Sequence, residues 1–95
     1  MVRDPRKVRQ NLLKKGFVEV QGAKHVFYDF TPDGALTEIR TFMSRNNQDL
    51  NNTLLSAMKN QLGFDSMRDF LDLIDCPMSE EDYIRILKGK NLLKD

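Results

Sequence analysis

The pattern of apolar positions predicts a helix at the start of the chain and three strands after it. Val8 and Leu12 recur four residues apart, between an Asp-Pro pair typical of helix starts and a glycine typical of helix ends. This spacing predicts a helix over residues 5–15. Runs rich in aromatic and β-branched residues follow, with a Thr-Pro-Asp-Gly turn before the last of them. The expected strands are 17–21, 24–31 and 35–43.

Period-two alternation sorts the side chains of these strands onto two faces of an antiparallel sheet. One face is apolar enough to be covered by helices, and the other is mixed and is expected to be open to solvent. The face expected to be covered carries Val18, Val20, Val26, Tyr28, Phe30, Thr37, Ile39, Thr41 and Met43. The face expected to be open carries Phe17, Glu19, His25, Phe27, Asp29, Leu36, Glu38, Arg40 and Phe42.

Three more helices are expected in the second half of the chain. An apolar repeat at helical spacing begins after Asn52 as a cap and ends at Gly63. Two shorter helices start at Ser66 and Ser79, and the first of them is stopped by the dipeptide Cys-Pro at 76–77.

The resulting element order is α-β-β-β-α followed by two short helices, which indicates an α+β fold with a three-stranded antiparallel sheet. We expect one domain, formed by residues 1–75 and extended by the helical residues 76–95. Leu12, Leu54 and Met58 are expected to pack against the covered face, where Tyr28 is read as a core residue.

Length and composition are typical of a soluble single domain. The 95 residues are 40% hydrophobic and 31% charged, close to the averages of globular proteins. The single cysteine, Cys76, cannot form a disulfide framework, and no apolar run is long enough for a signal segment or a membrane span. These features favour a cytoplasmic protein.

The net charge of +1 conceals an asymmetry along the chain. Residues 1–45 hold nine Lys/Arg against five Asp/Glu, whereas residues 46–95 hold six against nine. The stretch 65–82 has seven acidic residues and one basic residue. A basic half can face an acidic polymer, and two differently solvated surfaces are the alternative.

Candidate chemistry narrows to one histidine. The sequence holds no zinc-site spacing, no glycine-rich phosphate loop and no Gly-x-Ser-x-Gly elbow, so neither a metal nor a cofactor is expected. His25 is on the face expected to be open and follows Lys24 directly. A histidine near a cation can transfer protons in phosphodiester cleavage. An ordinary surface histidine in a strand is the alternative.

Several stretches of the chain resemble the HicA toxins, small ribonucleases of bacterial and archaeal toxin–antitoxin pairs. Residues 6–17 are similar to the family's opening helix, which ends in glycine and an aromatic residue. Residues 22–28, Gly-Ala-Lys-His-Val-Phe-Tyr, are similar to its Gly-Ser-His segment. Residues 53–64 are similar to its closing helix, and 65–75 to the Ser-x-x-x-Phe-x-x-Leu tail that often follows.

The resemblance implies a fold like a double-stranded-RNA-binding domain and a metal-independent endoribonuclease that cleaves mRNA and is neutralised by a small antitoxin protein. The family's catalytic histidine corresponds to His25. Ala23-Lys24 stand where the family has Gly-Ser, the chain is nearly neutral where family toxins tend to be basic, and residues 76–95 have no counterpart. The residues then expected to bind RNA are Lys24 and Arg40 at the phosphate, with Arg6, Arg9, Lys14 and Arg45 along the backbone.

A binding module without chemistry, for RNA or for a protein, is the alternative function. The face expected to be open carries Phe17, Phe27, Leu36 and Phe42, more apolar surface than solvent exposure explains. Either the C-terminal helices cover these side chains, or Phe27 and Phe42 bind a partner, for which the resemblance implies an antitoxin. The acidic stretch 65–82 is expected to lie away from this face or to shield it.

Overall fold

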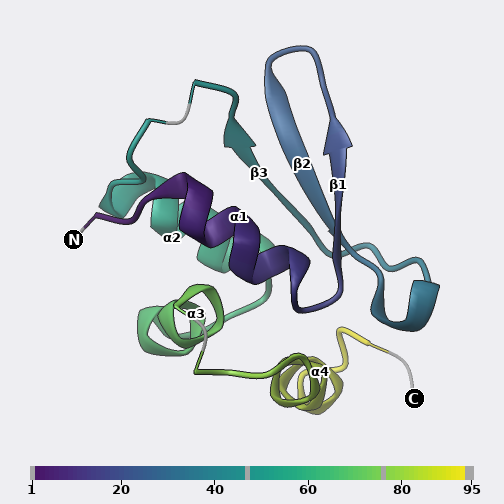
Figure 1. The fold of residues 1–95 in the computed structure, drawn as a ribbon. Helices are drawn as coiled ribbons and strands as arrows, with labels where there is room; N and C mark the ends of the chain where they lie inside the picture. The colour runs from purple at the N-terminus through teal and green to yellow at the C-terminus, as the bar shows by residue number, and fades with distance from the viewer. Residues whose placement is uncertain (1, 47, 76, 94–95) are drawn as a thin grey trace.

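The computed structural model describes residues 2–46, 48–75 and 77–93, and these form an α+β fold with an open three-stranded antiparallel sheet and four α-helices. The sheet order is β1-β2-β3, and the helices lie to one side of the sheet (Figure 1). The expected fold class and element order are therefore confirmed. Cys76, expected beyond the third helix, lies outside the described residues. The elements are α1 (Pro5–Leu13), β1 (Phe17–Gln21), β2 (His25–Phe30), the 3-10 turn η1 (Pro32–Gly34), β3 (Arg40–Ser44), α2 (Asn52–Gln61), α3 (Met67–Ile74) and α4 (Glu80–Gly89).

Each helix starts at a short polar side chain that accepts a backbone N–H bond from the first turn, which satisfies a donor that the helix itself leaves unpaired. The caps are Asp4, Asn51, Ser66 and Ser79. The prediction for α2 was wrong by one residue, because Asn51 and not Asn52 provides the cap. Among the described residues, no helix combines the length and apolar character that crossing a bilayer requires.

The alternation of faces is correct in β2 and β3 and wrong in β1. Register pairs Phe17 with Phe30 and Glu19 with Tyr28, so the odd-numbered side chains of β1 lie on the helix-covered face. Val18 and Val20, which we expected in the core, are 50% and 39% exposed on the open face. The cause is Phe17, whose ring lies 4.9 Å from that of Phe30. Burying this large ring removes more apolar surface from water than burying a valine does.

The connection between β2 and β3 is longer than the turn signal suggested. The 3-10 turn occupies Pro32–Gly34, and β3 begins only at Arg40, five residues later than expected. Thr37 organises the extra segment, because its hydroxyl donates to the Phe30 carbonyl at 2.6 Å and accepts the Ile39 N–H. As a result Leu36 is 91% exposed on this loop and does not belong to the open face.

The last helix contributes to the core and does not cover the open face. The Tyr83 ring packs 4.9 Å from Phe30 and 5.2 Å from Phe64, and its hydroxyl donates to the Leu62 carbonyl at 2.7 Å. Since Phe30 faces the helices, α4 lies on the covered side, which rules out α4 as a shield over the open face. On α2, Leu55 is fully buried, whereas Leu54, expected in the core, is 44% exposed.

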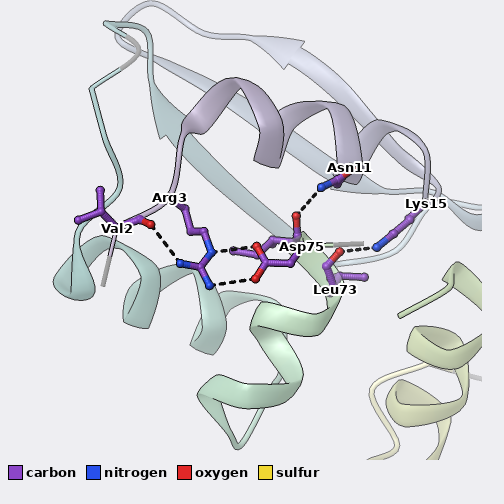
Figure 2. A network of polar contacts seen from close by, with 7 residues as sticks. Val2, Arg3, Asn11, Lys15, Leu73 and Asp75 are labelled. Carbon is purple, nitrogen blue, oxygen red and sulfur yellow. Dashed lines mark hydrogen bonds and ion pairs between the residues drawn. The ribbon is translucent and has the colours of Figure 1, made fainter. Parts of the chain in front are cut away.

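A polar network joins the N-terminal segment to the C-terminal end of α3 (Figure 2). Lys15 and Asn11 donate to the carbonyls of Leu73 and Ile74, which belong to the last turn of α3 and lack partners within that helix. Arg3 forms a bidentate ion pair with Asp75 at 2.8 and 2.9 Å. These bonds fix the helical layer behind the sheet.

Candidate functional site

His25 is the first residue of β2 and lies half-buried on the open face of the sheet. Its ring meets the ring of Phe42 edge-on at 4.8 Å between centroids, and Phe27 lies 6.4 Å away. In the register of β2 and β3, Ser44 is directly opposite His25. The aromatic neighbours hold the imidazole at one end of the sheet with its outer side toward solvent.

Two basic residues lie at the same end of the sheet. Lys24 precedes His25 in the turn between β1 and β2 and is exposed. Arg45 follows β3 and donates to the Gly22 carbonyl at 2.9 Å and to the Gln21 side chain at 2.8 Å. The end of β3 is thereby fixed to the turn that carries Lys24.

Gly22 allows this turn to pack closely on the histidine. Its N–H donates to the His25 carbonyl at 2.9 Å. A Cβ atom at this position would lie 2.7 Å from both the His25 carbonyl oxygen and the Phe27 ring, which is closer than a side chain can approach. A glycine is therefore required beside His25, one position away from where the HicA-like pattern has it.

Arg40 is at the opposite end of the open face. It is opposite Asp29, four residues along β2 from His25, which corresponds to roughly 13 Å of strand. Its guanidinium forms a bidentate ion pair with Asp29 at 2.5 and 3.1 Å and lies 4.8 Å from the centre of the Phe27 ring. The structure does not bring Arg40 together with His25 and Lys24.

The basic residues of α1 lie on the helical side of the molecule. Arg9 pairs with Glu19 at 2.5 and 3.2 Å, and Arg6 pairs with Asp4 at 3.2 Å. Lys14 is exposed at the end of the helix. Of the cations expected to bind RNA, only Lys24 adjoins the candidate histidine, because the Arg45 side chain runs to Gln21 and borders a hollow lined by Glu19 and Tyr28 of the covered face.

Glu19 and Tyr28 form a polar pair on the covered face. The hydrogen bonds from the Arg9 guanidinium lower the pKa of Glu19 from its usual value, and the Tyr28 hydroxyl, 3.1 Å away, acts in the same direction. Burial, reinforced by this bond to Glu19, raises the pKa of Tyr28 to about 12. Tyr28 is a buried core residue, as predicted, and Glu19 was wrongly expected on the open face beside His25.

The open face is more apolar than the alternation predicted. Phe17 is buried beneath α4, but Val18 and Val20 take its place, with Val20 opposite Phe27. Phe27 and Phe42 are opposite each other on β2 and β3, with their rings 5.7 Å apart. The two expected partner-binding residues therefore lie together next to His25, with Phe42 exposed and Phe27 partly covered by the Arg40 guanidinium.

A small pocket opens beside the histidine, at the outer edge of β3. It has a volume of about 150 Å³, and its walls come from β3 and α2. Sequence reasoning missed it, because its position depends on where β3 begins after the long connection. Its lining residues are Pro5, His25, Phe42, Met43, Ser44, Gln48, Leu50, Leu54, Ala57, Met58 and Gln61.

Comparisons with known proteins add no relative to this picture: no family model, no curated protein and no solved structure matches the chain. Within the described residues, no three His, Cys, Asp or Glu side chains gather in a way that could hold a metal ion.

Proposed function

We propose that the protein is an endoribonuclease that cleaves RNA without a metal ion, with His25 as its catalytic residue. The observation that carries the proposal is the position of His25, half-buried on the open face at the end of the sheet where the exposed Lys24 precedes it. A proton-transfer group and a cation lie there on a surface that a polyanionic strand can reach. The α-β-β-β-α order with helices on one side supports a fold like a double-stranded-RNA-binding domain.

The reaction that suits these groups is attack by the ribose 2′-hydroxyl on the neighbouring phosphorus. His25 takes the proton of the 2′-hydroxyl as the 2′-oxygen–phosphorus bond forms. The bond from phosphorus to the 5′-oxygen breaks, and that oxygen takes a proton from solvent or from a protonated His25. Lys24 stabilises the extra negative charge on the phosphate oxygens. The products are a 2′,3′-cyclic phosphate and a 5′-hydroxyl end.

The surroundings of His25 favour a flexible, single-stranded substrate. Aromatic rings on a sheet surface provide faces on which unpaired bases stack. The Phe42 ring contacts His25, and the Phe27 ring contacts Phe42 in turn. The role of toxin restrained by an antitoxin is the cellular function that the resemblance to the HicA family supports.

Replacement of the histidine is the direct test. Purified protein is incubated in EDTA with unstructured RNA, and the ends of the products are analysed. His25→Ala should lower the cleavage rate about 10²–10⁴-fold with an unchanged melting temperature, because the proton-transfer group is lost. Glu38→Ala, at an exposed site in the β2–β3 connection, is the control and should cleave like the wild type. A His25→Ala protein with wild-type activity would exclude the proposal.

A second candidate function, a protein-binding module, is favoured by the exposure of Val18 and Val20. Val20 is opposite Phe27, which is itself opposite Phe42, so the valines extend an apolar strip that RNA cleavage does not require. If this strip binds an antitoxin, Val20→Asp should weaken that complex while cleavage of RNA by the free protein persists. Co-purification with the product of a neighbouring antitoxin-like gene, compared for wild type and variant, measures the difference.

A further inference from the structure

The pocket beside His25 is apolar over most of its wall and polar at a few positions. Met43, Leu50, Leu54 and Met58 form its apolar part, and His25 and Phe42 form the side that faces the open sheet. Phe42 and Leu54 are among the exposed large hydrophobic residues of the protein. Both therefore border one cavity and are not isolated surface residues.

Its volume fits one aromatic ring. An apolar cavity of about 150 Å³ accommodates benzene, and this pocket has a volume of about 150 Å³. A pyrimidine base is built on a single six-membered ring, whereas a purine has two fused rings. The volume thus matches the single ring of uracil or cytosine more closely than the fused rings of adenine or guanine.

Polar groups in the wall suit the edge of such a base. Gln61 accepts a hydrogen bond from Thr41 at 2.7 Å through its side-chain oxygen, and no described residue accepts from its amide nitrogen. Ser44 and Gln48 add a hydroxyl and a second amide. These groups donate and accept hydrogen bonds, as a pyrimidine carbonyl and ring nitrogen need, in a site whose other walls are apolar.

We infer that this pocket binds a pyrimidine base next to the scissile phosphate and gives the cleavage its base preference. The inference rests on the proposed function, because His25 belongs both to the pocket wall and to the proposed reaction. Lys24 directly precedes His25 at this end of the sheet, so a base in the pocket can have its own phosphate at the histidine and this cation. An apolar side chain of a protein partner would need the cavity but not this adjacency to a cation.

Short RNAs that differ in one base on either side of a single cleavable linkage test the inference. The wild type should cleave at a pyrimidine about tenfold or more faster, in kcat/KM, than at a purine. Ala57→Met, which fills the pocket from α2, should reduce that ratio to near one. If Ala57→Met lowers the melting temperature, Leu54→Ala, which removes an exposed part of the pocket wall, replaces it in the same test. Ser56→Met, on the same helix outside the pocket, should keep the wild-type preference.

A titration with nucleotides separates the failure of the inference from that of the proposed function. Cleavage that depends on His25 but is equal at pyrimidines and purines would overturn the inference alone. If no cleavage occurs, NMR titration with uridine 3′-monophosphate still tests whether the pocket binds a pyrimidine. Shifts at Ala57 and Gln61 that guanosine 3′-monophosphate and inorganic phosphate do not produce would support a pyrimidine site. Absence of such shifts would overturn it and leave the cavity to a protein side chain.

Discussion

The two faces of the sheet are formed by the same three strands and have different roles. On the covered face Tyr28, Phe30 and Met43 are buried, and the inward polar group, Glu19, has its hydrogen bonds supplied by Arg9 and Tyr28. On the open face valines and phenylalanines remain partly exposed beside His25. The contrast indicates that stability is concentrated on one face, which leaves the other free to carry a binding surface that the fold does not need.

The largest effect should come from a matched pair of phenylalanines on the two faces. Phe17→Ala removes a ring packed between Phe30 and Tyr83 and should lower the free energy of unfolding by about 3–5 kcal/mol. Phe42→Ala removes a partly exposed ring and should cost about 1 kcal/mol. Urea denaturation of both variants measures the difference. Equal losses would mean that the open face is also part of the stabilising core.

Phe17 also shows where sequence reasoning failed. Alternation was correct in β2 and β3, where the open face carries charged residues such as Asp29 and Arg40 that the covered face lacks. In β1 alternation assigned two valines to the core and one phenylalanine to the open face. That assignment was wrong because it rested on the number of apolar residues and not on their size. A single ring in contact with Phe30 and Tyr83 outweighs Val18 and Val20, and Tyr83 comes from the other end of the chain. A local pattern cannot contain that contact.

The candidate site was predictable only as far as it is local in sequence. His25 and Lys24 are adjacent in the sequence, so their proximity could be predicted without knowledge of the fold. Ser44 is placed opposite His25 only by the pairing of β3 with β2, which comes after the irregular connection held by Thr37. The turn signal at 31–34 indicated a shorter connection. The pocket at the edge of β3 could not be predicted either, because its position depends on where β3 begins.

Removal of a cation from each side of the molecule should change RNA affinity unequally. Lys24→Ala removes a charge beside His25 and should reduce the magnitude of the log–log salt dependence of binding by roughly 0.7, the value for one phosphate contact on a single strand. Lys14→Ala removes an exposed charge at the end of α1 and should leave the slope unchanged. Fluorescence anisotropy of a labelled RNA with the His25→Ala protein, measured at several salt concentrations, gives the slopes. A larger effect at Lys14 would place RNA on the helical side.

The smallest effect concerns acid stability and tests the position of Glu19. The folded-state pKa of Glu19 is lowered, chiefly by its bonds to Arg9, so the folded protein holds the ionised carboxylate more favourably than the unfolded chain does. This contribution is complete above the unfolded pKa of about 4.3 and is lost as the pH falls through the folded value. Because Arg9 is half exposed, we expect it to amount to only about 1 kcal/mol.

Glu19→Gln should therefore lower the free energy of unfolding near pH 7, and the gap to the wild type should close as the pH falls below about 4. Glu38→Gln makes the same charge change at an exposed site in the β2–β3 connection and serves as the control. Urea melts of the three proteins between pH 3 and pH 7 measure the gap. If Glu19 were on the open face, as alternation predicted, the two variants would behave alike. A gap confined to Glu19→Gln would establish the inverted face of β1, on which the exposure of Val18 and Val20 depends.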